Sequence, residues 1–464
     1  MQQNFYINRI LTVFFSGLLL LAVSCSKDEG EGPDSLSKVS EYDGELALRW
    51  NELYLELERY TPGYRPPVSG RALAYMGLAA YESVWPGMAE SHRSVGSAFG
   101  GLELPEVNPA LAYHWPSSLV AAYVRSLELF FPAAPADQRI KIYRLQNDYY
   151  ALFKQEAPFD AFKRSTEFGR RVAEAVYDWS STDAAGHNAY LRNNDPAYLP
   201  PSGPGLWQPT APDFTPALLP YWGLARTFAA GAEDTVATPL AYSEQPGSPF
   251  YQQAEEVEQM VNRIRAGELT EEHWIAEFWS DDCAALTFTP AGRWIAIANQ
   301  VTASEDPSLD QAVELYARLG MALNDAGVRC WEEKYRFNIE RPIDFIRRVK
   351  GRAEWSTLMC PDGSGGYFTP PFPAYPSGHA TFGAAAAEVL SAFFGDNYGM
   401  TDRCHEGRLE FNGTPRSFDS FYAMAEENAW SRIPLGVHFR MDAEAGLSLG
   451  YQIGRKVNEL DWRR

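Results

Sequence analysis

The sequence has few cysteines, few histidines and a deficit of positive charge. Its 464 residues include 5 cysteines, 7 histidines and 40 lysines plus arginines, against 60 acidic residues. The resulting net charge of −20 argues against nucleic acid or an anionic membrane surface as a general partner. The cysteines also lack the spacing of a zinc site. Any anion-binding site must therefore be a local basic cluster in an acidic chain.

Long hydrophobic runs are missing after the N-terminus, so we expect no later membrane span. The N-terminus itself has Arg9, an apolar stretch over 10–23 and then Ser24-Cys25, which is a signal-peptide pattern. The residues LAVSC at 21–25 resemble a bacterial lipobox, in which the cysteine is lipidated. An ordinary secretory signal with Cys25 near its cleavage site is the alternative. We expect an exported lipoprotein, periplasmic or on the cell surface, that meets a membrane only through a lipid on Cys25.

Alternation typical of strands is scarce, whereas helical spacing of apolar residues covers most of the chain. We predict an all-α helical bundle of two packed halves. The helical patterns of the C-terminal part include a stretch near 418–459. The predicted divisions are a signal peptide at 1–24, a tether at 25–42, an N-terminal helical half at 43–200, a Pro- and aromatic-rich irregular segment at 201–250 and a C-terminal bundle at 251–464.

Besides Cys25 there are four cysteines, Cys283, Cys330, Cys360 and Cys404. An oxidising compartment permits disulfides between them. Four cysteines allow three pairings, and their spacing selects none of these.

One helix is predicted to begin at a possible anion site. The stretch PFPAYPSGHATFGAAAAEVL at 371–390 places Ser377, Gly378 and His379 just before a run of strong helix formers. Backbone N–H groups at a helix N-terminus lack intrahelical partners and attract anions, and glycine permits close approach. His379 is in position to move a proton.

Two further clusters lie on either side of this helix. Lys334 and Arg341 are seven residues apart and share a helical face if one helix continues between them. In SRIPLGVHFRMD at 431–442, Arg432 precedes Pro434, which suits a first helical turn. His438 and Asp442 then lie at i, i+4, so that Asp442 accepts the Nδ1 proton and leaves Nε2 of His438 bare as a nucleophile or metal ligand.

Together these groups suit a tetrahedral oxyanion whose centre becomes five-coordinate. Cations and N–H groups neutralise its oxygens, as phosphoryl transfer requires. His438 binds the central atom on one side, while His379 exchanges a proton on the other.

These motifs resemble the signature of the superfamily of type 2 phosphatidic acid phosphatases and vanadium haloperoxidases: Lys-x6-Arg-Pro, Pro-Ser-Gly-His and Ser-Arg-x3-Gly-x-His-x3-Asp. All three are present in order, from Lys334 to Asp442. The resemblance implies that His438 bonds to vanadium or phosphorus and that His379 is the acid/base. It also implies an oxyanion held by Lys334, Arg341, Ser377, Gly378 and Arg432.

The flanking residues look most similar to vanadium chloroperoxidases and their bacterial relatives, with Trp331 and Phe372 at aromatic positions near the halide region. This similarity implies vanadate as cofactor, and hydrogen peroxide, a halide and a small organic acceptor as partners. The leading alternative is an acid phosphatase that cleaves a phosphomonoester through a phosphohistidine in the same cage. A non-catalytic surface-binding lipoprotein is a third class, disfavoured because the motifs are intact. Trp331 is equally well explained as a core residue.

Lipidation of Cys25 yields a testable prediction. The processed wild-type protein should partition with membranes, because a lipidated cysteine with several acyl chains anchors stably. Cys25→Ser should release the protein or leave its signal uncleaved, as measured by membrane fractionation and mass of the mature N-terminus. A fully soluble, processed wild type would contradict lipidation.

Overall fold

The computed structural model describes residues 38–361 and 367–464, so the predicted signal peptide and Cys25 lie outside the described residues. The only strands assigned there, β1 (Met400–Asp402) and β2 (Arg416–Phe418), pair antiparallel. Short 3-10 helices are η1 (Val39–Glu41), η2 (Trp85–Gly87), η3 (Gly96–Ala98), η4 (Ala189–Leu191) and η5 (Trp222–Leu224). The α-helices are α1 (Glu45–Tyr60), α2 (Pro66–Val84), α3 (Trp115–Phe130), α4 (Ala136–Glu156), α5 (Phe159–Ser181), α6 (Pro249–Arg265), α7 (Thr270–Phe278), α8 (Pro290–Glu305), α9 (Leu309–Phe337), α10 (Pro342–Val349), α11 (Gly378–Phe394), α12 (Phe421–Trp430) and α13 (Arg440–Asn458).

The centre of the bundle is α2, and every one of its residues is buried. Its sequence is apolar or small on all sides, which is typical of a helix enclosed by others. It packs along α9, while α1 packs on α8 and α3 on α5. Close approach of α2 to α9 depends on glycine: a Cβ at Gly320 would lie 2.7 Å from Leu73 O. The predicted all-α bundle of two packed halves is confirmed, and one apolar core continues through both halves.

A second tight helix pair positions the C-terminal motifs. Helices α11 and α13 pack along each other, and Gly446, Gly450 and Gly454 form one stripe of α13 at the contact. A Cβ at Gly446 would lie 2.6 Å from Ser377 O, and one at Gly454 would lie 2.7 Å from Ala385 O. The absence of side chains on this stripe therefore brings the N-termini of the two helices together.

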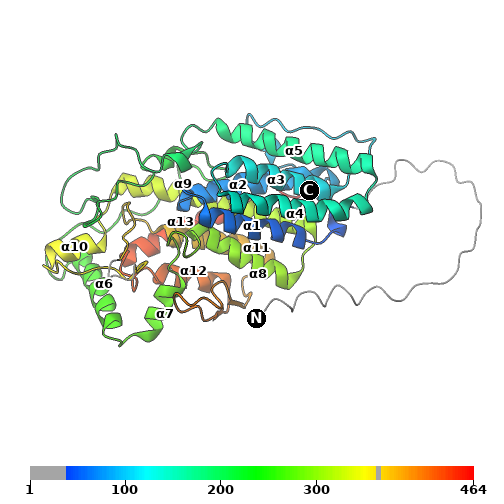
Figure 1. The fold of residues 1–464 in the computed structure, drawn as a ribbon. Coiled ribbons are helices and arrows are strands. Elements are labelled where there is room, and N and C mark those ends of the chain that lie inside the picture. Colours follow the sequence, from blue (N-terminus) through cyan, green and yellow to red (C-terminus); the bar gives the residue numbers. More distant parts are fainter. Residues whose placement is uncertain (1–37, 362–366) are drawn as a thin grey trace, which may run out of the picture.

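Figure 1 shows α1 to α5, in blue to cyan, side by side at one end of the molecule. Helices α6, α7 and α10 lie at the other end, with the long connecting segments. One of these segments, 182–248, contains only η4 and η5 as regular elements. It is anchored by backbone hydrogen bonds, including Trp207 N to Asn338 O (2.8 Å) and Leu218 N to Pro371 O (2.9 Å). Ordered irregular chain thus covers the loops beside the C-terminal motifs.

Two local predictions were wrong. The helix carrying Lys334 ends at Phe337, because Asn338 takes a left-handed conformation (φ 52°), and Arg341 is instead the N-cap of α10. The helical stretch predicted near 418–459 contains two helices, since α12 ends at Trp430 and α13 begins at Arg440. Between them, Pro434 cannot donate to a helical ladder and Gly436 has φ +88°. Pro434 therefore lies in a turn and not in a first helical turn.

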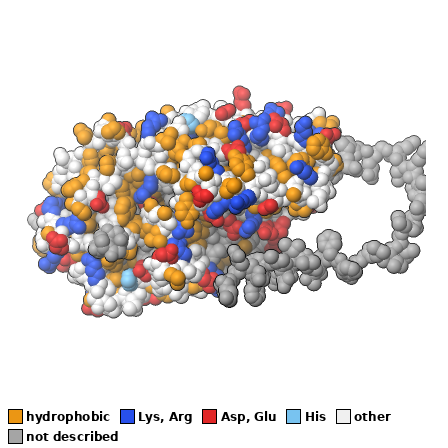
Figure 2. All heavy atoms as spheres, in the orientation of Figure 1, with side chains coloured by type: hydrophobic (Ala, Val, Ile, Leu, Met, Phe, Trp, Pro, Cys, Tyr) orange, Lys and Arg blue, Asp and Glu red, His pale blue; other side chains and the backbone are white. Residues whose placement is uncertain are grey.

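The surface mixes both signs of charge. On the face in Figure 2, basic and acidic side chains are interspersed with hydrophobic ones, and no continuous basic patch is seen on that face. Among the described helices, none is both long and apolar enough to cross a membrane.

The structure selects one of the cysteine pairings that the sequence left open. Cys283 and Cys360 form a disulfide across 77 residues of sequence. Cys330 and Cys404 are free thiols.

The glycine stripe gives a stability prediction. Gly450→Ala should lower the free energy of unfolding by about 1–3 kcal/mol, because the new methyl group would overlap Thr381 O on α11. Chemical denaturation monitored by circular dichroism measures the change. The control is Gly100→Ala, where a Cβ meets nothing within 4 Å. Equal stability of the two variants would show that the helices separate without cost.

Candidate functional site: a buried oxyanion cage

The N-terminus of α11 forms one side of the site. Ser377 is its N-cap, and its hydroxyl accepts a hydrogen bond from Ala380 N (3.4 Å). The Ser377 N–H donates to Asp442 O (2.8 Å), which ties the start of α11 to the start of α13. Gly378 begins the helix, and His379 follows with 7% of its surface exposed. The predicted helix N-terminus is confirmed.

His438 faces this helix end from the turn before α13. Its Nδ1 lies 2.9 Å from Asp442 Oδ2, and the same oxygen accepts from Phe439 N (2.9 Å). His438 Nε2 lies 3.1 Å from Arg341 Nη1, which has only protons to offer. Nε2 is therefore the lone-pair nitrogen and Nδ1 carries the proton. The predicted pairing of His438 with Asp442 is correct, although His438 precedes the helix.

Lys334, Arg341 and Arg432 are completely buried. Backbone carbonyls hold Lys334 and Arg341: Lys334 Nζ donates to the carbonyl oxygens of Pro373, Ala374 and Pro376. Arg341 donates from Nε to Phe372 O (2.9 Å) and from Nη1 to Val437 O (2.8 Å). These carbonyls belong to the segments that lead into α11 and α13. The same segments therefore place both the cations and the histidines.

Several buried polar atoms at this site are left without partners. Arg341 Nη2 and Arg432 Nε are donors, and they and His379 Nε2 have no hydrogen-bond partner among the described residues. A buried, unpaired donor is costly, so the two arginine N–H groups together indicate a missing acceptor. A tetrahedral oxyanion such as vanadate or phosphate offers the required oxygens. By contrast, the described residues contain no cluster of three His, Cys, Asp or Glu side chains that could hold a metal cation.

Burial without a bound anion shifts the pKa values of these groups. Burial lowers the pKa of Lys334 to about 7, and the nearby charges of Arg341 and Arg432 lower it further. Burial also lowers the pKa of Arg341 to about 10 and that of Arg432 to about 9, so both stay charged at neutral pH. The pKa values of His379 and His438 fall well below their usual range, because burial and the neighbouring cations disfavour protonation. Burial raises the pKa of Asp442, against the effect of the Phe439 N–H. A bound anion would counteract the effect of burial on the cations.

Trp331 and Phe372 form an aromatic wall at the cage. Their ring centres lie 4.9 Å apart, and both side chains are buried. Arg341 lies over the Phe372 ring at 4.8 Å, and Lys334 Nζ lies 5.1 Å from the centre of that ring. A Cβ on Gly378 would lie 3.4 Å from the Trp331 ring. The two predicted pocket aromatics therefore adjoin the predicted oxyanion-binding residues.

Sequence reasoning missed the groups that hold Arg432. Its Nη1 donates to Trp279 O (3.0 Å), and its Nη2 lies 3.7 Å from Met359 Sδ. The carboxyl groups of Asp281 and Asp282 interact electrostatically with its guanidinium. These partners are at least 70 residues away in sequence and belong to no motif, so long-range packing alone reveals them.

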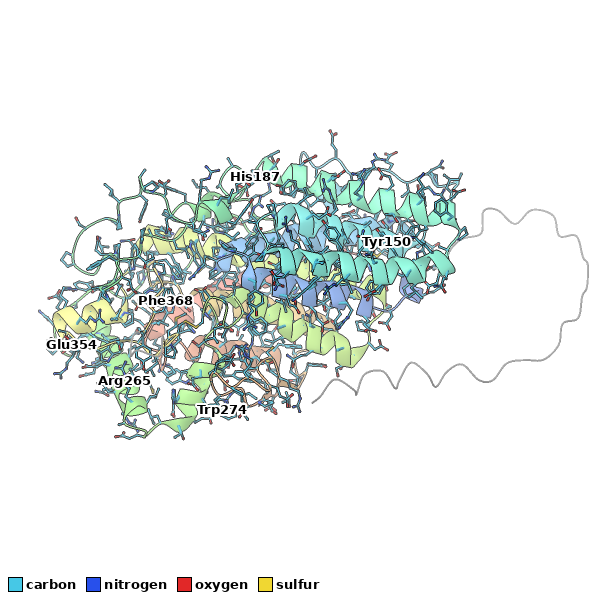
Figure 3. All side chains as sticks on the ribbon, in the orientation of Figure 1. Tyr150, His187, Arg265, Trp274, Glu354 and Phe368 are labelled. Atoms are coloured by element: carbon cyan, nitrogen blue, oxygen red, sulfur yellow. A yellow bond between two sulfur atoms is a disulfide. The ribbon has the colours of Figure 1, made fainter. Side chains whose placement is uncertain are left out.

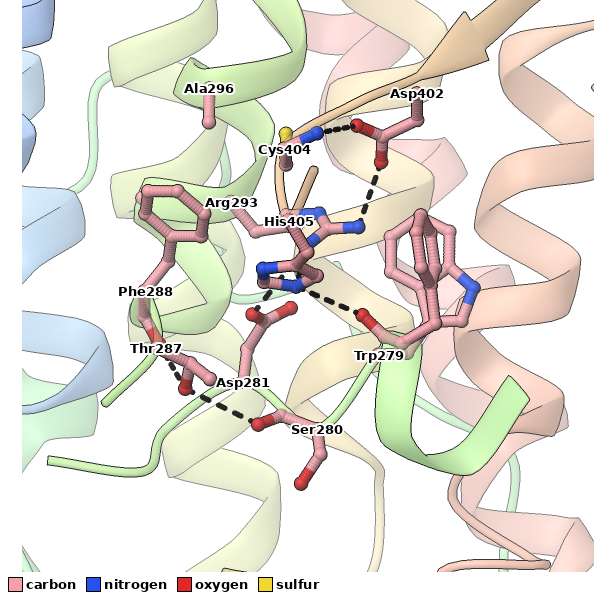
Figure 4. A network of polar contacts seen from close by, with 12 residues as sticks. Trp279, Ser280, Asp281, Thr287, Phe288, Arg293, Ala296, Asp402, Cys404 and His405 are labelled. Atoms are coloured by element: carbon pink, nitrogen blue, oxygen red, sulfur yellow. Dashed lines mark hydrogen bonds and ion pairs between the residues drawn. The ribbon is translucent and has the colours of Figure 1, made fainter. Parts of the chain in front are cut away.

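Arg293 lies beside Trp279 and Asp281, two of the residues that interact with Arg432 (Figure 4). This buried arginine pairs with Asp402 (2.7 Å) and lies 3.9 Å from Asp281. Its guanidinium stacks over the Trp279 ring at 4.8 Å and contacts His405 Nε2. His405, which the sequence gave no reason to place at a site, thus belongs to a structural network beside the cage.

The other histidines lie outside the cage. His92 contacts Ser91 and Glu314, and His114 contacts Ser117. The His187 ring lies beside Tyr177, with ring centres 6.0 Å apart, and His273 faces Glu277 (3.5 Å).

Comparison with known proteins agrees with this geometry. Residues 314–461 match a family described as the second helical-bundle domain of VCPO. The chain is 27% identical to the vanadium chloroperoxidase of Curvularia inaequalis over 495 residues, covering 88% of this chain and 81% of that protein. The crystal structure of a bacterial vanadium-dependent iodoperoxidase superposes with a TM-score of 0.77 and 29% identity, covering 93% of this chain and 98% of that one. The chain is thus similar to vanadium haloperoxidases in sequence and in fold over most of its length.

A solved structure of lower sequence identity shows that the fold is similar, and no more. The holo structure of a bacterial vanadium-dependent chloroperoxidase superposes with a TM-score of 0.64 at 14% identity, covering 87% of this chain and 93% of that one. The haloperoxidase helical arrangement is therefore retained over nearly the whole described chain.

The buried cations give a prediction for anion affinity. Arg341→Ala and Arg432→Ala should each weaken orthovanadate and phosphate binding by about 2–5 kcal/mol, because each leaves anion oxygens without a buried charged partner. Lys334→Ala should have a similar effect, since Lys334 is fully buried. Isothermal titration calorimetry measures the affinities. Arg263→Ala is the control, because Arg263 is 56% exposed; unchanged affinity in the cage variants would place the anion elsewhere.

The pKa of Lys334 predicts how anion affinity depends on pH. As the pH rises through this lowered pKa, a growing fraction of the anion-free protein loses the Lys334 proton, and that fraction must take up a proton when an anion binds. Affinity should therefore be highest below this pKa and fall as pH rises through it, by up to about tenfold per pH unit for one linked proton. Sulfate is the probe, because it does not titrate near neutral pH. Lys334→Met should remove most of the pH dependence of sulfate affinity. An unchanged pH dependence in that variant would show that another group takes up the proton.

Proposed function

We propose that this chain is a vanadate-dependent haloperoxidase that uses hydrogen peroxide to oxidise a halide, with vanadate held through His438. The observation that carries the proposal is the set of buried polar atoms without partners, Arg341 Nη2, Arg432 Nε and His379 Nε2, beside the unprotonated Nε2 of His438. The relatives named above support vanadate as the cofactor.

Each cage residue has a role that follows from its position. Lys334, Arg341 and Arg432 supply positive charge, and Ser377 and Gly378 supply the helix N-terminus, to the oxygens of the anion. Asp442 orients His438 through Nδ1 (2.9 Å), which leaves Nε2 as the nitrogen that would hold the central atom of the anion. Bound vanadate supplies a Lewis-acidic centre that activates hydrogen peroxide without changing oxidation state.

His379 is suited to the proton transfer that the reaction needs. Halide oxidation by hydrogen peroxide consumes one proton for each hypohalous acid and water formed. The Nε2 of His379 has no partner among the described residues, and this side chain is the most exposed of the cage histidines. We therefore assign His379 to proton exchange with the bound peroxide. Hypohalous acid then halogenates a small organic acceptor, and Trp331 and Phe372 are the proposed wall of the halide pocket.

We also propose that the protein is exported and anchored through a lipid on Cys25. The Cys283–Cys360 disulfide supports export, because disulfides persist in oxidising compartments. No described residue bears on the anchor itself.

The histidines distinguish peroxidase from phosphatase chemistry. The purified protein with vanadate and peroxide should brominate an organic acceptor, and phosphate should compete for the same cage. His438→Ala should abolish turnover, and Asp442→Asn should reduce it by favouring the wrong imidazole tautomer. In His379→Ala, vanadate should still bind while bromination falls, by about 10²–10⁴-fold for loss of a general acid/base.

A phosphomonoester assay with and without vanadate runs in parallel. Rapid ester hydrolysis without bromination at any vanadate concentration would favour the phosphatase, which can use the same cage through a phosphohistidine. Vanadate should then act as an inhibitor, because it mimics the five-coordinate transition state.

A further inference from the structure

Arg432 is positioned from two loops that are far apart in sequence. Its Nη1 bonds to the carbonyl of Trp279, at the start of the loop between α7 and α8 (3.0 Å). Its Nη2 meets the sulfur of Met359, in the loop between α10 and α11 (3.7 Å). A thioether is a weak acceptor, and Arg432 Nε has no partner among the described residues. The position of this guanidinium therefore depends on how the two loops are held relative to each other.

The Cys283–Cys360 disulfide joins these same two loops. Cys360 directly follows Met359, and Cys283 is four residues after Trp279. Between the described residues of the two loops no direct hydrogen bond is found. Arg65 bridges them from α2's N-terminal side, through an ion pair with Asp282 (3.3 Å) and a stack on Phe368 (5.7 Å), but a quarter of its side chain is exposed.

Each loop also has bonds of its own, within itself, to the turn that carries Arg432 and to neighbouring helices: Arg59 of α1 donates to Ala285 O (2.9 Å), and Arg265 of α6 donates to Thr357 O (3.0 Å). Asp282 N donates to Phe288 O (2.8 Å), and Phe368 N donates to Met359 O (2.9 Å). Leu358 N donates to Leu435 O (2.9 Å), three residues after Arg432. Figure 3 shows Phe368 above Trp274 of α7, in the part of the molecule where these loops meet. The disulfide is thus the direct covalent tie between the two partners of Arg432.

We infer that the Cys283–Cys360 disulfide positions Arg432 for oxyanion binding, with Met359 as its second positioning residue. This inference rests on the proposed oxyanion cage. Reduction adds two electrons and two protons, breaks the S–S bond and gives two thiols. The part of the α10–α11 loop around Met359 can then move away from the other loop, so that Arg432 loses its fixed direction. The end of that loop next to α11 keeps its carbonyl bonds to Lys334 and Arg341. The expected result is weaker anion binding by a protein that remains folded.

The first experiment removes the tie. The double variant Cys283→Ser/Cys360→Ser should bind inorganic phosphate and orthovanadate about tenfold more weakly, the usual scale for losing a group that orients a ligand. Saturating vanadate should restore halide turnover, because the reacting groups remain in place. A purely structural role would lower the melting temperature without this rescue.

Reversible reduction of the wild type covers the case in which the double variant does not fold. A phosphine, itself oxidised to the phosphine oxide, converts the disulfide to thiols. Phosphate is the probe, since it is not reduced. Its affinity should fall by a similar factor and return after reoxidation, with circular dichroism confirming the fold at each step.

Met359→Leu tests the second contact without touching the disulfide. It should weaken phosphate binding by about threefold to tenfold, the scale of one net hydrogen bond. Met321→Leu is the matched control, because Met321 is equally buried in α9 within the main apolar core. Its phosphate affinity should be that of the wild type.

The outcomes separate this inference from the proposed function. A wild type that binds phosphate and vanadate while the reduced and double-serine forms bind within about twofold of it would overturn the positioning role alone. Equal loss in Met359→Leu and Met321→Leu would also overturn it. A wild type that binds neither anion would overturn both the cage and this inference.

Discussion

The cationic side chains of Lys334, Arg341 and Arg432 are buried close together, and the rest of the site depends on the groups that stabilise this buried positive charge. Each would be expensive to bury alone. Lys334 and Arg341 are held by the carbonyl oxygens of the segments leading into α11 and α13, and Arg432 by Trp279 O and Met359 Sδ. Carbonyl dipoles solvate the cations without cancelling their charge. The cage therefore keeps a net attraction for an anion.

The helix packing makes this arrangement possible. The glycine stripe of α13 lets its N-terminal turn, with Asp442, reach the start of α11, and Ser377 N bonds to Asp442 O across the junction (2.8 Å). The same junction carries His379 on one side and His438 on the other. A helix dipole, an oriented imidazole and two guanidinium groups thus converge because the glycine stripe of α13 places no side chain between the two helices.

From the sequence, the residues that come together at the site could be predicted more accurately than the backbone conformation around them. Lys334, Arg341, His379 and His438 come together as expected, because an oxyanion requires these groups whatever the backbone does between them. The helix expected to join Lys334 to Arg341 is absent, since Asn338 adopts a left-handed conformation that no apolar periodicity reveals. His438 and Asp442 pair as predicted because a turn into a helix N-terminus also brings positions i and i+4 together. The partners of Arg432 could not be predicted from the sequence, because a backbone carbonyl and a thioether leave no recognisable sequence motif.

The complete burial of α2 bears on whether the C-terminal segment of this chain can fold without the N-terminal helices. All of the signature residues lie in the C-terminal part of the chain, within or near the matched segment 314–461. Yet the long face of α9 that precedes Lys334 is covered by α2, from the other end of the sequence. Cut out by itself, the C-terminal segment would expose that face to water. The residues of the cage therefore come from one part of the sequence, but that part depends on α2 for its packing. If segment 314–461 were moved into another protein, a substitute for α2 would be needed to cover α9.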